Sequence, residues 1–74
     1  MQRFRIRLDI SPDMMEEYYA GRSTTVFAIS EGGVSVQFPA RLLRPYMTHE
    51  GIHGLFELIT DGEFRLQDFR RLGP

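Results

Sequence analysis

One stretch of the sequence has residue types that could bind a metal, His49-Glu50-Gly51-Ile52-His53. It matches the H-E-x-x-H pattern, in which two histidines on one helical face hold zinc and the glutamate activates water. Glycines within and just after the stretch each weaken a helix by about 1 kcal/mol relative to alanine. In an extended strand the two histidines would lie about 13 Å apart. We therefore expect a glycine-rich turn whose histidines bond to loop backbone, and metal binding through His49 and His53 is the last alternative.

A second candidate set is Arg3, Arg5 and Arg7, which alternate with apolar residues and so share one face of a strand. Three guanidiniums spaced by about 6–7 Å could follow a phosphate backbone, with Arg65 among the arginines that would have to join them. We favour the alternative that these side chains pair with Asp or Glu on a neighbouring strand or are simply solvated. The net charge of −1 gives no overall attraction to nucleic acid or to a membrane.

The third candidate set lies in the basic and apolar turn Arg41-Leu42-Leu43-Arg44, which leads into Pro45-Tyr46. Arginine and tyrosine are frequent among the residues that dominate protein interfaces. We expect the leucines to belong to the core. For Arg41, Arg44 and Tyr46, a structural role and a partner-binding role stay equally open.

Length and composition limit the kinds of protein that this sequence can form. A chain of 74 residues makes one domain, residues 1–74. It has no cysteine, which excludes disulfides, thiolate metal sites and thiol catalysis. It also lacks the run of about 20 apolar residues of a membrane helix and the apolar core of a signal peptide. We expect a cytoplasmic protein.

The sequence pattern predicts five strands, one helix and one helical turn. Ser11 and Pro12 mark the start of the helix and Gly21 its end. The expected strands are residues 4–10, 24–29, 34–38 and 52–60, and a last one from position 64, where the alternation slips between Gln67 and Phe69. The remaining segments are a helical turn at 40–44 that Pro45 ends, a loop at 46–51, a hairpin turn at 61–62 and a tail from residue 70.

These elements predict an α+β domain of order β-α-β-β-(short helical turn)-β-β. Two hairpins and a first strand favour a small, curled, mostly antiparallel five-stranded sheet or a partly open barrel. The strand at 52–60 is apolar on both faces, so we expect it to be central. Methionines and tyrosines form a stripe on the helix that we expect to pack on the sheet: Met14, Met15, Tyr18 and Tyr19.

Several motifs of this chain occur together in one known family. RFRIRLDIS, VQFPA, LRPY and above all THEGIHG-x-FEL resemble the short bacterial proteins of domain of unknown function 2835, found mainly in gammaproteobacteria. The resemblance covers nearly the whole chain. It implies a single cytoplasmic domain with no assigned activity, so it transfers no catalytic residue. The residues that carry it are Phe38, Pro39, Arg44, Pro45, Thr48, His49, Gly51, Ile52, His53 and Gly54.

From the sequence we expect a small non-enzymatic binding domain without cofactor or catalytic residues. Its binding surface is predicted in the loop at residues 41–54, where polar and Gly-Pro-rich residues gather. The candidate binding residues are Arg41, Arg44, Tyr46, Thr48, His49 and His53, and the expected partner is a protein. A nucleic-acid module using Arg3, Arg5, Arg7 and Arg65 is the alternative. A homodimer through an open sheet edge is a further alternative.

Overall fold

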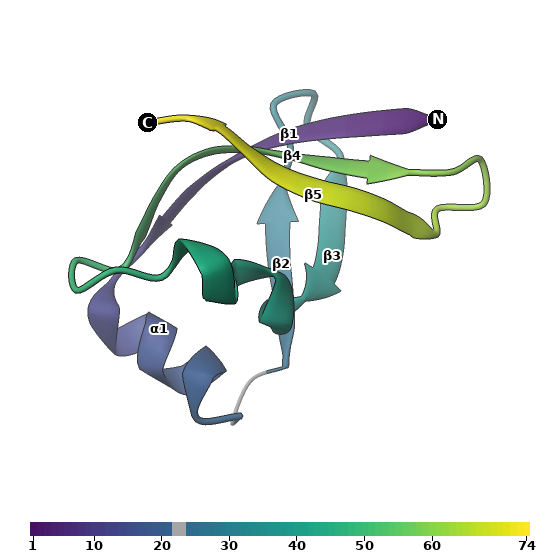
Figure 1. Ribbon diagram of the computed structural model, residues 1–74. Helices are drawn as coiled ribbons and strands as arrows, with labels where there is room; N and C mark the ends of the chain where they lie inside the picture. Colours follow the sequence, from purple (N-terminus) through teal and green to yellow (C-terminus); the bar gives the residue numbers. More distant parts are fainter. Residues whose placement is uncertain (22–23) are drawn as a thin grey trace.

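The computed structural model describes residues 1–21 and 24–74 and has the predicted α+β class and order of elements (Figure 1). The chain runs through β1 (Gln2–Ile10), α1 (Pro12–Tyr19), β2 (Thr25–Ile29), β3 (Ser35–Pro39), the 3-10 helix η1 (Ala40–Tyr46), β4 (Ile52–Thr60) and β5 (Leu66–Gly73). Within these described ranges, no helix is long and apolar enough to cross a membrane.

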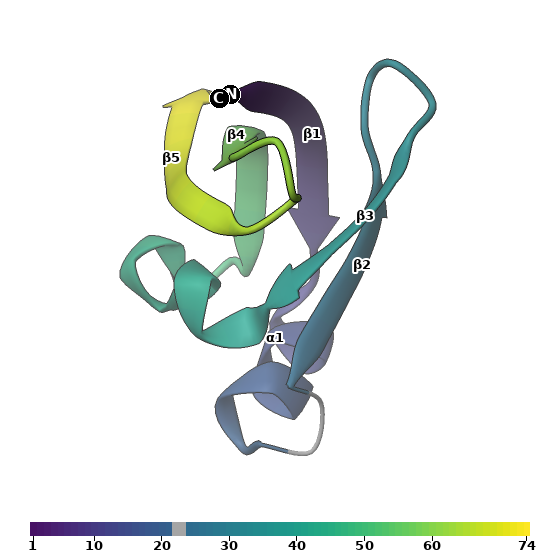
Figure 2. The ribbon, with the colours of Figure 1, turned by 90° about the vertical axis from the view of Figure 1, so that its right-hand side faces the viewer.

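The strands form two antiparallel sheets rather than one five-stranded sheet, and they do not close into a barrel. One sheet has the order β1-β4-β5, which confirms the central place of β4, and the other is the β2-β3 hairpin. The hairpin crosses the three-stranded sheet at a steep angle (Figures 1 and 2). It meets β1 where Glu31 N donates a 2.8 Å hydrogen bond to Arg5 O. Because of this angle, β1 and β2 do not continue as one sheet.

The core lies between the two sheets and is closed by η1. Alternate residues of β1, Ile6 and Leu8, are buried, as are Val26 and Phe38 of the hairpin. An aromatic cluster joins the layers: the Phe69 ring lies 5.0 Å from that of Phe38 and 5.4 Å from that of Phe56. The predicted alternation of β1 and of the hairpin therefore becomes the two faces of this core.

The helix α1 begins and ends as predicted but covers less of the core than its stripe indicated. Ser11 Oγ accepts a hydrogen bond from Met14 N at 3.2 Å, and Gly21 has a φ of +80° after the last turn. Met15 packs against the core, whereas Met14 and Tyr19 are exposed. The prediction that the whole stripe packs on a sheet is wrong, because α1 lies mainly against η1.

Three predicted boundaries are also wrong. The last strand begins at Leu66 rather than at position 64, because Phe64 lies in the preceding turn with a φ of +63°. Pro45 does not end the helical turn at residues 40–44, because the φ that proline imposes suits a 3-10 helix, and η1 continues to Tyr46. The predicted tail is the second half of β5, in which Arg70 pairs with Glu57. The slip predicted after Gln67 is present: Leu66 and Asp68 pair with successive β4 residues, so the residue between them bulges.

Candidate functional site

A tight turn at residues 48–51 lies within the predicted 41–54 region and packs against the end of β1. Thr48 and Gly51 exchange two backbone hydrogen bonds of 3.1 Å, and Thr48 Oγ1 donates to Gly51 O at 2.7 Å and accepts from Glu50 N at 3.2 Å. Gly51 has a φ of +96°, and a Cβ there would lie 2.0 Å from Ile10 O. Glycine is therefore required for both conformation and space.

His53 fastens this turn to β1 through both of its ring nitrogens. Nε2 lies 2.6 Å from Glu50 O, and Nδ1 contacts the Asp9 carboxylate. Both partners accept hydrogen bonds, so the arrangement favours the doubly protonated imidazolium. The Glu50 carbonyl first, and then Asp9, raise the pKa of His53 above its ordinary 6.5.

The histidine motif has the turn-and-strand context predicted for it. His49 lies in the turn and His53 at the start of β4, so no helix places them on one face. Both ring nitrogens of His53 already contact Asp9 and Glu50. In the part of the chain that the structure describes, no three His, Cys, Asp or Glu residues are grouped so as to hold a metal ion.

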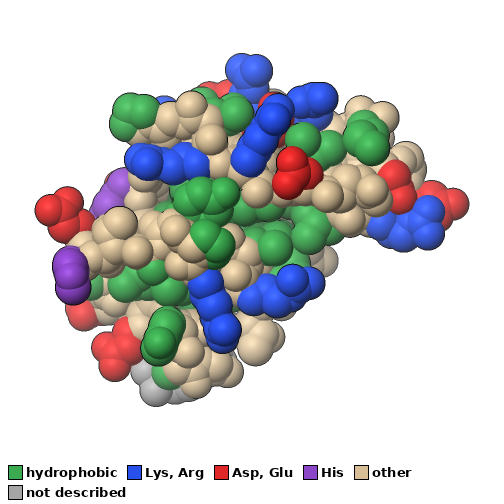
Figure 3. Space-filling model, viewed as in Figure 1, with side chains coloured by type: hydrophobic (Ala, Val, Ile, Leu, Met, Phe, Trp, Pro, Cys, Tyr) green, Lys and Arg blue, Asp and Glu red, His purple; other side chains and the backbone are tan. Residues whose placement is uncertain are grey.

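A hollow of about 370 Å³ lies between η1, the turn and the β4–β5 pair. We call it the Tyr46 hollow; its lining residues are Pro45, Tyr46, Met47, Thr48, Glu50, His53, Phe56 and Arg71. The Tyr46 ring stands edge-on to that of Phe56, with ring centres 5.1 Å apart. In Figure 3 apolar side chains occupy the space between β5 and η1, with basic side chains on both sides. The hollow combines an aromatic floor with a charged rim.

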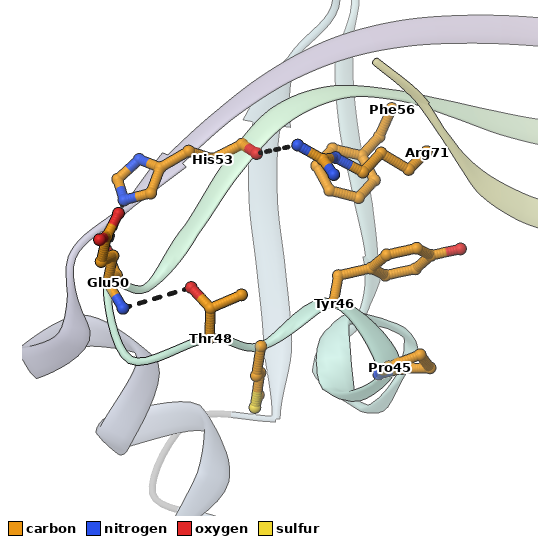
Figure 4. Close-up of a pocket in the computed structure, with 8 residues that line it drawn as sticks. Pro45, Tyr46, Thr48, Glu50, His53, Phe56 and Arg71 are labelled. Atoms are coloured by element: carbon orange, nitrogen blue, oxygen red, sulfur yellow. Dashed lines mark hydrogen bonds between the residues drawn. The ribbon is translucent and has the colours of Figure 1, made fainter. Parts of the chain in front are cut away.

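Arg71 crosses from β5 to the rim of the Tyr46 hollow (Figure 4). It pairs with Phe56 across the strands, and its Nη2 donates to His53 O at 3.2 Å. Gly54 leaves room for it, since a Cβ at that position would lie 2.8 Å from Arg71 Nε. Among the described residues Arg71 forms no ion pair. Its charge is thus available to a bound group.

The structure brings together three of the six predicted binding residues and separates the others. Tyr46, Thr48 and His53 line the Tyr46 hollow. Arg41 and Arg44 line a second hollow of about 260 Å³ beside α1. His49 is exposed and lines neither of these two hollows. The buried Leu43 confirms the core role expected of that residue.

On the outer face of the three-stranded sheet, arginines surround one buried carboxylate, as the favoured pairing alternative predicted. Glu57 is only 3% exposed, and its oxygens lie 3.1 Å from Arg3, 3.8 Å from Arg5 and 2.8 Å from Arg70. The bonded Arg70 leads the effects that lower the pKa of Glu57, against the opposing effect of burial. Arg7 instead donates to Pro74 O at 3.4 Å.

The fourth arginine of the nucleic-acid alternative lies apart from this cluster, in the turn between β4 and β5. Arg65 Nε donates to Asp61 Oδ2 at 2.8 Å, and its Nη2 lies 3.3 Å from Glu63. Asp61 also accepts from the backbone N–H groups of Glu63 and Arg65. These bonds, led by that from the Arg65 N–H, lower the pKa of Asp61. Arg65 therefore belongs to the local structure of the turn.

Two residues that line the hollow, Phe56 and Arg71, were not among the predicted binding residues. The signal was available, because period-two alternation continued beyond Phe69 places Arg71 on the same inward face. The small Gly54 on the neighbouring strand indicated space for a long side chain there. The predicted strand ended near the bulge, so Arg71 was assigned to the tail instead of to this face.

Comparison with known families places the chain in one of them. A family model described as "Protein of unknown function (DUF2835)" matches residues 2–72. We find no match to a curated protein and none to a solved structure. The chain belongs to the DUF2835 family.

Proposed function

For this member of the DUF2835 family, we propose a non-enzymatic function as a small bacterial, cytoplasmic protein-binding domain that uses the Tyr46 hollow. The observation that carries the proposal is an aromatic floor next to a guanidinium that forms no ion pair among the described residues. Tyr46 and Phe56 form the floor, and Arg71 reaches the rim without an ion pair among the described residues. Aromatic residues and arginine are the types that contribute most to protein interfaces.

The lining also favours a kind of partner. An apolar side chain would contact the Tyr46 ring, which the fully buried Phe56 supports from below, and an adjacent Asp or Glu would form a bidentate pair with Arg71. Glu50 on the opposite rim disfavours a second acidic residue there. We therefore propose a protein segment in which one acidic residue lies next to an apolar one.

The hollow is held ready for such a segment by the contacts beneath it. Thr48 and Gly51 close the turn, and His53 ties it to Asp9 at the end of β1. A site that is already ordered loses less conformational entropy when it binds. The role of Thr48 and His53 in this proposal is to position the rim, and that of Tyr46 and Arg71 is to contact the partner.

Site-specific photo-crosslinking in the cells that naturally make this protein tests this function. A photoreactive amino acid replaces Pro45, which is exposed on the rim, and in a control chain it replaces Glu63, which is exposed on the β4–β5 turn. We expect a discrete crosslink to a different protein from position 45 and no such crosslink from position 63. Equal crosslinking at both positions, or none at position 45, would contradict the proposal.

Nucleic-acid binding through Arg3, Arg5, Arg7 and Arg65 is the second candidate. One observation favours it: the cations outnumber the single carboxylate around Glu57. It ranks below protein binding because Arg3, Arg5 and Arg65 all contact carboxylates. Titration with short RNA and DNA at low and moderate salt tests it, since binding by phosphate contacts must weaken with salt.

A further inference from the structure

The outer edge of β3 carries backbone groups that no other strand meets. The hairpin register pairs Val36 with Ala28 and Phe38 with Val26, and the hydrogen bonds Ser30 N to Val34 O and Ala40 N to Thr24 O follow the same alternation. The intervening residues, Ser35 and Gln37, therefore direct their N–H and C=O groups away from β2. In the part of the chain that the structure describes, no other strand pairs with that side of β3 (Figures 1 and 2).

This edge lacks most of the features that commonly prevent strand pairing. Residues 34–40 contain no charged side chain, although 26% of the chain is charged. Protective edges usually carry lysine, inward charges, a bulge or a covering loop. Here only Pro39 interrupts the donors, at the last residue of the strand. The edge is thus open to another neutral strand.

Exposed apolar side chains adjoin the open edge. A hollow of about 280 Å³ between β3 and the three-stranded sheet is lined by Val34, Val36 and Phe64, among others. Phe64 is 67% exposed and has a φ of +63°, a strained conformation for an aromatic residue. Local backbone preference would favour glycine or asparagine at that position. Phe64 is thus an exposed aromatic residue next to the unpaired edge of β3, and this combination indicates a contact surface.

We infer that a second copy of this chain pairs with β3, antiparallel and about a two-fold axis at Val36. In that register Ser35 faces the partner's Gln37, and Gln37 faces the partner's Ser35. Because these residues present both backbone groups outward, the pairing closes four hydrogen bonds. The two hairpins become one four-stranded sheet.

The chemistry of β3 favours a copy of itself over a foreign strand. Ser35 and Gln37, whose backbone groups point outward, come opposite each other when two copies of β3 pair. The segment is neutral, so this pairing brings no like charges together. The partner's Val36 would extend the apolar surface formed by Val36 and Phe64. A short chain with a small core also gains from the added burial.

Sedimentation analysis over a range of protein concentrations tests this pairing with two matched double variants. Both change side chains on the outer face of β3 and leave the bonds to β2 unchanged. Ser35→Lys with Gln37→Lys places lysine opposite lysine across the axis. Ser35→Lys with Gln37→Glu places lysine opposite glutamate in the same register.

We expect wild type to dimerise with increasing concentration, the Lys/Lys variant to weaken dimerisation at least tenfold, and the Lys/Glu variant to retain it at low salt. A wild type that stays monomeric at millimolar concentration would overturn the inference. So would equal dimerisation of both variants, which would place the contact elsewhere. Equal loss in both would also overturn this register. Circular dichroism confirms that each variant is folded.

Discussion

The two faces of the β4–β5 pair use arginine in opposite ways. On the outer face, Arg70 and two β1 arginines share the buried carboxylate of Glu57. On the inner face, Arg71 reaches the rim of the Tyr46 hollow and bonds only to a backbone carbonyl among the described residues. Arg70 and Arg71 are adjacent in sequence, yet the pleat of β5 gives one a structural role and the other an open charge.

For the proposed binding surface, arginine content alone is therefore a poor guide. What matters is which guanidiniums have carboxylate partners within the fold. The outer cluster contains more cations, but they form ion pairs with the central Glu57 carboxylate. The Tyr46 hollow contains fewer, and its arginine lies next to aromatic side chains. Single substitutions can break one of these two regions while leaving the other intact.

The largest expected effect is loss of the turn under the hollow in Gly51→Ala. The positive φ costs roughly 1–3 kcal/mol for a non-glycine residue, and the added Cβ would lie 2.0 Å from Ile10 O. Urea denaturation should show a loss of at least this size. Gly62→Ala is the control, because nothing lies within 4 Å of its Cβ position. Equal stability of the two variants would contradict the geometry given for the turn.

The next largest effect is expected for Glu57→Gln, which breaks the outer region. The three arginines around a buried neutral amide would repel one another, so the midpoint of denaturation should fall. Without this carboxylate the arginines should also bind heparin more tightly, so the variant should elute from a heparin column at a higher salt concentration than wild type does. Unchanged stability together with unchanged heparin elution would show that the Glu57 cluster does not hold these charges.

The same carboxylate predicts an acid limit to stability. Because the folded pKa of Glu57 is lowered from 4.5, its contribution is present above that value and is lost as the pH falls through the folded pKa. Denaturation midpoints measured for wild type from pH 5 downward should fall. In Glu57→Gln this dependence should be reduced. An identical acid profile in both proteins would rule out Glu57 as its source.

His53 predicts a pH effect of opposite sign in the hollow. Its raised folded pKa means that its stabilising contribution is complete below 6.5 and is lost as the pH rises through the folded pKa. NMR titration of the ring should give an apparent pKa above 6.5 in wild type and a lower one in Asp9→Asn. A pKa unaffected by Asp9→Asn would contradict the contact between the two side chains.

The smallest effect on stability is expected for Arg71→Gln. Arg71 is exposed and forms no ion pair among the described residues, so its loss should cost no more than about 0.5 kcal/mol. Arg70→Gln should cost more, since it removes the shortest contact to Glu57. Urea denaturation of both variants measures the difference. A greater loss in Arg71→Gln would reverse the roles assigned to the two arginines.

The sequence predicted the strongly periodic parts of this molecule well. Alternation located β1 and the hairpin, and Ser11, Pro12 and Gly21 marked the helix. The HEGIH stretch was correctly placed in a turn leading into a strand because glycine opposes a helix there. These features depend on local backbone preference, which residue types reveal directly.

The remaining features depend on contacts between distant residues. The separation into two sheets follows from the angle at which the hairpin crosses β1, which no local pattern reports. The Tyr46 hollow needs Arg71, which lies 25 positions after Tyr46. It also needs Gly54, whose lack of a side chain leaves room for Arg71. His53 joins Asp9 across 44 positions. Such pairs are set by register and bulges, which alternation alone does not determine.

The central claim is tested most directly by measuring how Arg70→Gln and Arg71→Gln affect binding to the protein crosslinked at position 45. The two changes are chemically identical and one residue apart, and they lie on opposite faces of β5. We predict that Arg71→Gln weakens binding at least tenfold in calorimetry and that Arg70→Gln leaves the affinity within about twofold. Equal weakening by both, or a greater effect of Arg70→Gln, would contradict the assignment of binding to the Tyr46 hollow.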